Sequence, residues 1–179
     1  MSFGALNGMS ISKPTGTCAA TGRAIGVGER FVATLVERTD QAGLERQDYC
    51  VEAWQGGARP APPVRMFGHW RGVMPEARGE RRQLLSDEEL LDLFEELGGA
   101  TEPKRLAFRY VLGLMLVRRR VLRMVGERRS DGVRVMLVRP KAAAPDSPAI
   151  EVADPGTDEA TINEVIEQVG AVIGGEAGA

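Results

Sequence analysis

The stretch that decides the fold class is RVLRMVGERRSDGVRVMLVR, residues 120–139. Two runs rich in β-branched residues flank Ser130, Asp131 and Gly132, and Asp-Gly between such runs is the strongest short-range signal for a β-hairpin. A second interpretation prolongs the preceding helix to Val125. We favour the hairpin, with strands over 121–128 and 133–139, and therefore expect an α+β fold.

Helices are predicted on both sides of this hairpin. Ser86 and Glu89 form the signature of a capping box, and apolar residues then follow at helical spacing: Leu90, Leu91, Phe94 and Leu97. A second helix is predicted over residues 102–119, with Pro103 in its first turn. A last amphipathic helix is expected over 157–174, with its apolar stripe on Ile162, Val165, Ile166, Val169, Val172 and Ile173.

Proline- and glycine-rich stretches divide the chain, because they favour turns and loops over regular elements. The predicted order is a flexible N-terminus (1–16), a β-rich segment (17–54), a linker (55–83), the helix–helix–hairpin unit (84–141), a second linker (142–156) and the C-terminal helix (157–174). Within the second linker, residues 150–152 are a candidate edge strand.

The β-rich segment contains two halves of a metal-binding motif. TCAATGR (17–23) and DYCVEAW (48–54) are both similar to a Cys-x-x-Cys knuckle, in which two thiolates converge on one zinc ion. The second ligand position of each half holds a residue that cannot replace a thiolate, Thr21 in one and Ala53 in the other. Cys18 and Cys50 supply two of the four ligands that a structural zinc site needs.

Three states of the two cysteines are open from the sequence. A mixed zinc site would add Asp48, Glu52 or the single histidine, His69, and a disulfide is disfavoured in a reducing compartment. We favour two free thiols packed as small apolar side chains at a relict knuckle. Thr21 is then expected to hydrogen-bond locally and Trp54 to cover the site, so no metal or other cofactor is expected.

At these residues the chain resembles an uncharacterised family of small bacterial proteins with an N-terminal zinc-ribbon-like segment. The pattern is C-x-x-[CT]-G-R, then G-E-x-F-x-x-x-L-x-E, then R-x-D-Y-C-x-x-[CA]-W, and the blocks LLDLFEEL and DGVRVMLVRP are also similar. The resemblance implies a degenerate zinc-ribbon-like segment followed by the helix–helix–hairpin unit. It implies no established activity.

Charged residues are strongly segregated along the chain. Residues 103–141 hold twelve basic side chains against two acidic ones, whereas residues 84–102 and 142–179 hold seven and eight acids and no base. A winged-helix-like nucleic-acid binder would use the arginine cluster Arg118, Arg119, Arg120, Arg123, Arg128 and Arg129. We favour neutralisation of this cluster by the acidic helices, because the overall pI near 5.6 is low for a nucleic-acid-binding protein.

The sequence shows no set of nucleophile, base and acid, and we interpret His69 as a turn histidine packed on Trp70. Residues 1–16 lack the cationic start and apolar core of a secretory signal, and the longest apolar run of the chain is too short to span a bilayer. We therefore expect a cytoplasmic, non-catalytic interaction module that binds an unidentified protein. Nothing in the sequence points to a small-molecule substrate or to a membrane.

Overall fold

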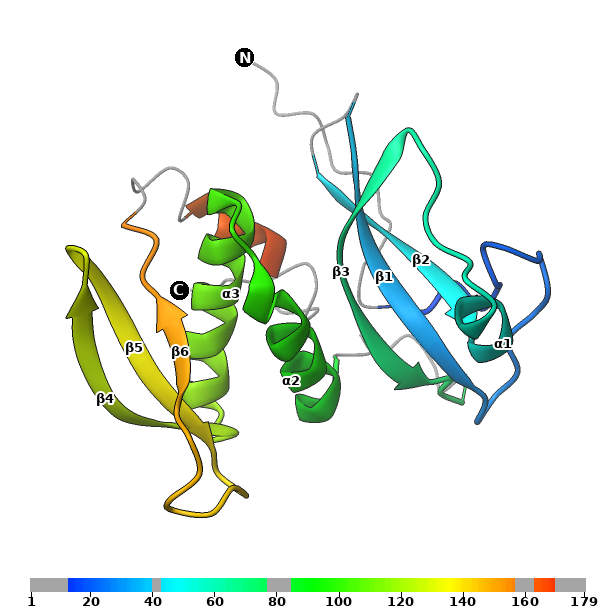
Figure 1. The fold of residues 1–179 in the computed structure, drawn as a ribbon. Coiled ribbons are helices and arrows are strands. Elements are labelled where there is room, and N and C mark those ends of the chain that lie inside the picture. The colour runs from blue at the N-terminus through cyan, green and yellow to red at the C-terminus, as the bar shows by residue number, and fades with distance from the viewer. Residues whose placement is uncertain (1–12, 40–42, 77–84, 157–162, 170–179) are drawn as a thin grey trace. The chain divides into compact units, whose positions relative to one another are not determined.

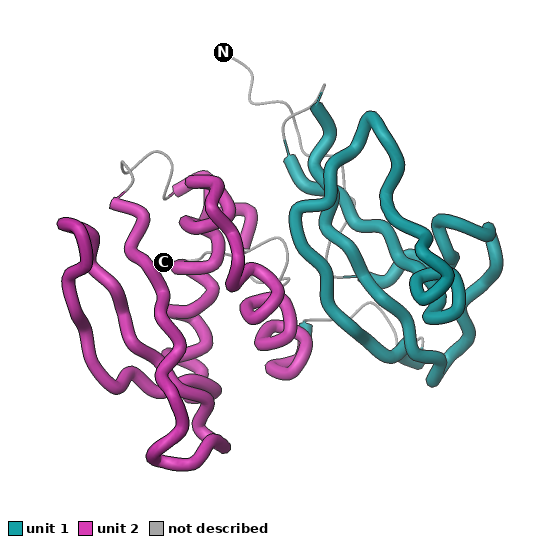
Figure 2. Tube along the Cα trace, in the orientation of Figure 1, with its two compact units in different colours: residues 1–85, 171–176 teal, residues 86–170, 177–179 magenta. Residues whose placement is uncertain are grey.

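The computed structural model describes residues 13–39, 43–76, 85–156 and 163–169. The chain is a mixed α+β protein that divides into two compact units, residues 1–85 with 171–176 and residues 86–170 with 177–179 (Figure 2). Within the described ranges, each unit contains one three-stranded antiparallel sheet (Figure 1). No helix in these ranges is both long enough and apolar enough to cross a membrane.

The first unit is built on a sheet of order β2-β1-β3. Its strands are β1 (Arg30–Arg38), β2 (Leu44–Cys50) and β3 (Val64–Val73), and the short helix α1 (Val51–Gln55) follows β2 directly. Residues 31–36 of the central strand are all buried. Since successive side chains of a strand point to opposite faces, both faces of β1 are covered.

Two predicted boundaries in this unit are wrong. The linker predicted over 55–83 contains β3, because the aromatic residues Phe67 and Trp70 bury themselves in a second ladder with β1. The flexible start predicted over 1–16 includes Thr15, whose backbone N–H and hydroxyl both donate to the buried carboxylate of Asp48. Residues 1–12 and 77–83 lie outside the described residues.

The second unit begins with the predicted capping box. The Ser86 hydroxyl accepts the Glu89 N–H at 3.2 Å, and the Glu89 carboxylate accepts the Ser86 N–H at 2.9 Å. Helix α2 (Asp87–Glu96) is followed by the 3-10 turn η1 (Leu97–Gly99) and by α3 (Pro103–Arg118). The buried face of α2 includes Leu93 and leaves Leu91 half-buried, which corrects the predicted stripe.

The hairpin prediction is confirmed. Strands β4 (Leu122–Ser130) and β5 (Val133–Pro140) pair antiparallel, and β6 (Ile150–Ala153) completes a sheet of order β4-β5-β6. Asp131 and Gly132 at the turn have φ of 51° and 82°, as the twisted two-residue hairpin turn requires. The expected edge strand exists, so the linker predicted over 142–156 is interrupted by β6.

Helix α3 packs closely against one face of this sheet. A Cβ on Gly113 would lie 3.1 Å from Phe94, 3.4 Å from Met136 and 3.8 Å from Val152. Residues 163–169 form the described part of the C-terminal helix, with Val165 and Val169 buried. The rest of the predicted 157–174 helix lies outside the described residues.

Candidate functional site

The first half of the cysteine motif forms a tight turn beside β2. The N–H of Gly22 donates to the Cys18 carbonyl and the N–H of Cys18 donates to the Arg23 carbonyl, both at 2.8 Å. Gly22 has a φ of +70°, which explains why glycine stands at this place in the motif. The N–H of Ala19 donates to the Asp48 carbonyl at 2.8 Å and so ties the turn to β2.

Several hydrogen-bond donors surround the sulfur of Cys18. The residue is fully buried, and Cys50 is also buried. Burial raises the pKa of the Cys18 thiol, but hydrogen bonds from the Thr21 side chain and from the backbone of Cys50, Thr21 and Ala20 outweigh it and lower the pKa to about 6. The structure therefore brings Cys18, Thr21 and Cys50 together, and both cysteines are free.

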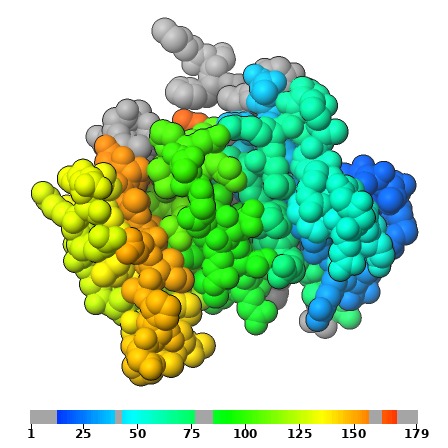
Figure 3. Space-filling view, viewed as in Figure 1, coloured from blue at the N-terminus to red at the C-terminus, as the bar shows by residue number. Residues whose placement is uncertain are grey.

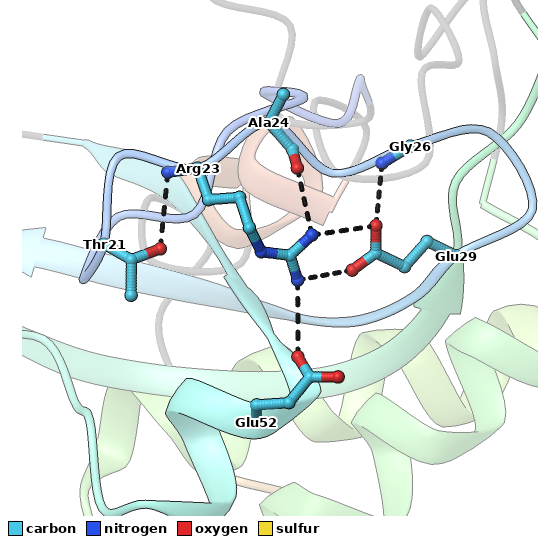
Figure 4. A network of polar contacts seen from close by, with 6 residues as sticks. All are labelled: Thr21, Arg23, Ala24, Gly26, Glu29 and Glu52. Atoms are coloured by element: carbon cyan, nitrogen blue, oxygen red, sulfur yellow. Dashed lines mark hydrogen bonds and ion pairs between the residues drawn. The ribbon is translucent and has the colours of Figure 1, made fainter.

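Arg23 joins the two halves of the motif (Figure 4). Its guanidinium donates to both carboxylate oxygens of Glu29, at 2.6 and 3.1 Å, and to Glu52 at 3.3 Å. The hydrogen bond to Glu29, followed by one to the Cys50 side chain, raises the pKa of Arg23. The same arginine lowers the pKa of Glu29. A cation thus bridges the Cys18 turn and the start of α1.

The remaining motif residues lie on or beside α1. Ala53 is half-buried within the helix and offers no ligand side chain. The Trp54 ring lies 5.6 Å from Tyr49 and 5.1 Å from His69, and the Arg59 guanidinium stacks over it at 3.7 Å. His69 is therefore a strand residue of β3 that packs on Trp54, which corrects its interpretation as a turn histidine packed on Trp70.

The oxygen donors considered as zinc ligands bind protein groups in this structure. Asp48 accepts from Arg46 and Thr15, and Glu52 accepts from Arg23. Within the described ranges, no group of three or more histidine, cysteine, aspartate or glutamate side chains could hold a metal ion. In these ranges, the thiols of Cys18 and Cys50 are the metal-ligating pair that the motif retains.

Sequence reasoning missed a buried ion pair beside the cysteines. The Arg46 Nε donates to Asp48 Oδ1 at 2.8 Å, and both side chains are buried. The Arg46 guanidinium also lies over the rings of Phe31 and Trp70, at 5.5 and 5.1 Å. The Arg-x-Asp spacing on a predicted strand is the sequence signal for this ion pair, because residues two apart on a strand lie on the same face.

A second buried arginine has a structural role in the other unit. Arg109 of α3 is 8% exposed and donates to the carbonyls of Phe94 at 3.3 Å and Glu151 at 2.8 Å. Burial lowers the pKa of its guanidinium. The Arg109 side chain thus links α3 to α2 and to β6. Nothing in the sequence around Arg109 predicts these hydrogen bonds, because their acceptors are backbone carbonyls of other elements.

The six arginines of the predicted cluster are all exposed, and we call them the arginine surface. Three of them lie at the C-terminal end of α3 and three lie on β4, in the hairpin coloured yellow in Figure 3. Arg119 pairs with Asp87 at 3.0 Å and Arg128 with Glu151 at 2.5 Å. Among the described residues, no acid pairs with the other four, namely Arg118, Arg120, Arg123 and Arg129. The predicted internal neutralisation is therefore partial.

Exposed apolar side chains lie among these arginines. Met124 and Val125 on β4 are 46% and 42% exposed, and Val133 at the start of β5 is also exposed. Val125 is the extra residue of a β-bulge between Met124 and Gly126. The hairpin thus presents guanidinium groups and apolar side chains together.

Comparisons with family models, with curated proteins and with solved structures found no match to this chain. The zinc-ribbon-like resemblance stays a prediction.

Proposed function

We propose that the chain is a non-catalytic protein-binding module and that the arginine surface, with its apolar neighbours, is the binding site. The observation that carries the proposal is the group of four exposed arginines with no acidic partner among the described residues. Of these four, Arg123 directly precedes exposed Met124 on β4, and Arg129 lies farther along the same strand. Arginine and methionine are enriched in protein–protein interfaces relative to the rest of the surface.

The chemistry of this surface favours a partner that is both acidic and apolar. Guanidinium groups form charge-assisted, bidentate hydrogen bonds with carboxylates, which a lysine surface could not match geometrically. An exposed methionine adapts its shape to different apolar partners. A segment with alternating carboxylates and aliphatic side chains would satisfy both.

Phosphates would also bind arginines, and this makes a nucleic acid the rival partner. Residues 122–140 contain no Phe, Tyr or Trp on which bases could stack, and the chain has a formal net charge of −2. A nucleic acid would also leave the exposed aliphatic side chains of β4 unused. The protein partner accounts for both kinds of side chain.

In this proposal the first unit is a structural module derived from a metal knuckle. The chain order supports this reading, because a tight turn, the β1–β2 hairpin and a helix carry the two halves of the motif in succession. The Arg23 bridge would replace the link that a zinc ion provides between two knuckles. The proposal places the protein in the cytoplasm, where free thiols are ordinary.

Fluorescence anisotropy with a labelled peptide of alternating Glu and Val tests the proposal. The double variant Arg123→Ala/Arg129→Ala should weaken binding by about tenfold, which corresponds to roughly 1.4 kcal/mol. Arg30→Ala, an exposed arginine of the first unit, is the matched control and should bind as the wild type does. A peptide of alternating Glu and Ser should bind more weakly, because it lacks the apolar contacts.

The rival partner is tested in the same titration. Labelled single-stranded and duplex DNA replace the peptide at low and moderate salt. Sub-micromolar binding of DNA that weakens steeply with salt, without binding of the Glu-Val peptide, would favour the nucleic-acid function.

A further inference from the structure

We infer that Cys18 and Cys50 form a two-thiolate site for a soft monovalent metal ion, Cu(I). The site belongs to the first unit, so the inference goes beyond the partner binding proposed for the arginine surface. Three observations carry it. The two sulfurs lie together, hydrogen-bond donors surround them, and the described residues supply no ligand set for an ion that needs more than two ligands.

The fold brings the two sulfurs together just beneath the surface. Cys18 forms a parallel bridge with Asp48 of β2, two residues before Cys50, and the backbone N–H of Cys50 donates to the Cys18 sulfur. Both cysteines are buried and free, whereas residues 19–23 of the adjoining turn are all exposed. A metal ion therefore has a short path from solvent to the sulfurs at this turn, and a metal site requires such a path.

Hydrogen-bond donors are arranged around both sulfurs. The Thr21 hydroxyl and the backbone of Ala20 and Thr21 donate to Cys18. Thr21 Oγ1 also accepts the Arg23 N–H at 3.3 Å (Figure 4), so the hydroxyl hydrogen is left for the sulfur. The Arg23 guanidinium donates to the Cys50 sulfur. Donors of this kind orient metal-bound thiolates and stabilise their charge.

The number of ligands selects the ion. Thiolates are soft ligands that favour Cu(I) and Zn(II), and a structural zinc site needs four ligands. Among the described residues, no group of three or more histidine, cysteine, aspartate or glutamate side chains could hold a metal ion. The carboxylates of Asp48 and Glu52 accept hydrogen bonds from arginines instead. Cu(I) is satisfied by two thiolates in a linear arrangement, so it fits the pair that the motif retains.

Thr21 and Ala53 change the charge of the site as well as its ligand count. Each stands where a Cys-x-x-Cys knuckle holds its second thiolate, so the site has two sulfurs where the full motif has four. Two thiolates around a monovalent ion leave one net negative charge, and the Arg23 guanidinium and the surrounding N–H groups donate to these same sulfurs. The two differences from the motif therefore remove a zinc site and leave a site suited to an ion of lower charge.

Anaerobic transfer of Cu(I) from its coloured bicinchoninate complex tests the inference on the full chain. The wild type should remove one Cu(I) per chain, whereas Cys18→Ser and Cys50→Ser should each lose this transfer. Met124→Leu, which removes an exposed sulfur of the second unit, is the matched control and should still take one Cu(I). Transfer that persists in Cys18→Ser/Cys50→Ser, or no transfer to the wild type, would overturn the site.

X-ray absorption of the Cu(I)-loaded wild type is a second test that alters no residue. The spectrum should show two sulfur ligands in a linear arrangement and no nitrogen or oxygen ligand. A third ligand, or a ligand other than sulfur, would refute the two-thiolate site even if one Cu(I) binds. Excess Zn(II) should leave the bound Cu(I) in place, because two thiolates fill half of a structural zinc shell. Displacement of Cu(I) by Zn(II) would refute the selection of the ion by ligand number.

Discussion

Arg123 and Arg139 stand directly opposite one another on β4 and β5, although both carry a positive charge. A cross-strand pair of like charges costs stability, typically a fraction of about 1 kcal/mol. A second pair, Arg129 and Arg134, repeats the arrangement near the turn, five positions away along β5 and therefore on the opposite face of the sheet. No acid in the described chain pairs with Arg123 or Arg129, so each of these two arginines is available to an acidic ligand.

Exchanging one charge of this pair should separate stability from binding. In Arg123→Glu, the new carboxylate faces Arg139, so the free energy of unfolding should rise by about 0.2–1 kcal/mol in urea denaturation. The same variant should bind the Glu-Val peptide more weakly. A variant that loses stability, or that binds the peptide as tightly as the wild type does, would contradict this account of the hairpin.

Removing the carboxylate of Asp48 should strongly destabilise the first unit. Asp48→Ala leaves the buried Arg46 guanidinium without this carboxylate and removes the acceptor of Thr15, so a loss of about 3–5 kcal/mol is expected. Urea denaturation measures it. Glu151→Gln breaks the exposed pair with Arg128 and is the control, with an expected loss below about 1 kcal/mol. Equal losses in the two variants would refute the role given to the buried pair.

Replacing the Thr21 hydroxyl should raise the pKa of Cys18 above 6. Thr21→Val removes the side-chain hydrogen-bond donor that makes the largest contribution to lowering this pKa. A Cys50→Ser background keeps the backbone N–H at position 50 and leaves one thiol in the chain. Thiolate absorbance in the ultraviolet, followed against pH, gives the pKa. An unchanged midpoint would show that Thr21 does not hold the thiolate.

The same thiol should make stability depend on pH. Folding lowers the pKa of Cys18 from its ordinary value of 9.0 to about 6, so the thiolate's contribution is complete above pH 9 and is lost as the pH falls through 6. The difference in unfolding free energy between the Cys50→Ser variant and Cys18→Ser/Cys50→Ser should therefore grow from pH 5.5 to pH 9. A difference that stays constant over this range would contradict the lowered pKa.

Gly113 should not tolerate a side chain. Gly113→Ala places a Cβ 3.1 Å from Phe94, and overpacking of this kind costs about 1–3 kcal/mol. The helix propensity of alanine offsets about 1 kcal/mol of this. Thermal and urea denaturation should show a net loss, whereas Leu114→Ala on the exposed side of α3 should change little. A stabilised Gly113→Ala would mean that α3 lies farther from Phe94 of α2 than the structure shows.

Local signals in the sequence predicted several elements well. The Asp131-Gly132 turn, the Ser86–Glu89 capping box and the Pro103 helix start each depend on a few neighbouring residues, and the structure contains all three. These features are set by backbone conformation and short-range hydrogen bonds, which a linear pattern can express.

The sequence could not predict features that depend on partners far along the chain. β3 follows a proline-rich run that predicts a linker, and only pairing with β1 makes residues 64–73 a strand. The contacts of Arg46, Arg109 and His69 depend in the same way on distant elements. The cysteine motif placed Cys18, Thr21 and Cys50 at one site, but the bridging role of Arg23 needed the structure.

A charge-swap titration tests the central claim most directly. The Arg123→Glu/Arg129→Glu variant should lose binding of the Glu-Val peptide by at least about tenfold and should gain binding of a Lys-Val peptide that the wild type rejects. Circular dichroism confirms that the variant is folded. Undiminished binding of the Glu-Val peptide by the folded variant would contradict the claim that the arginine surface is the binding site.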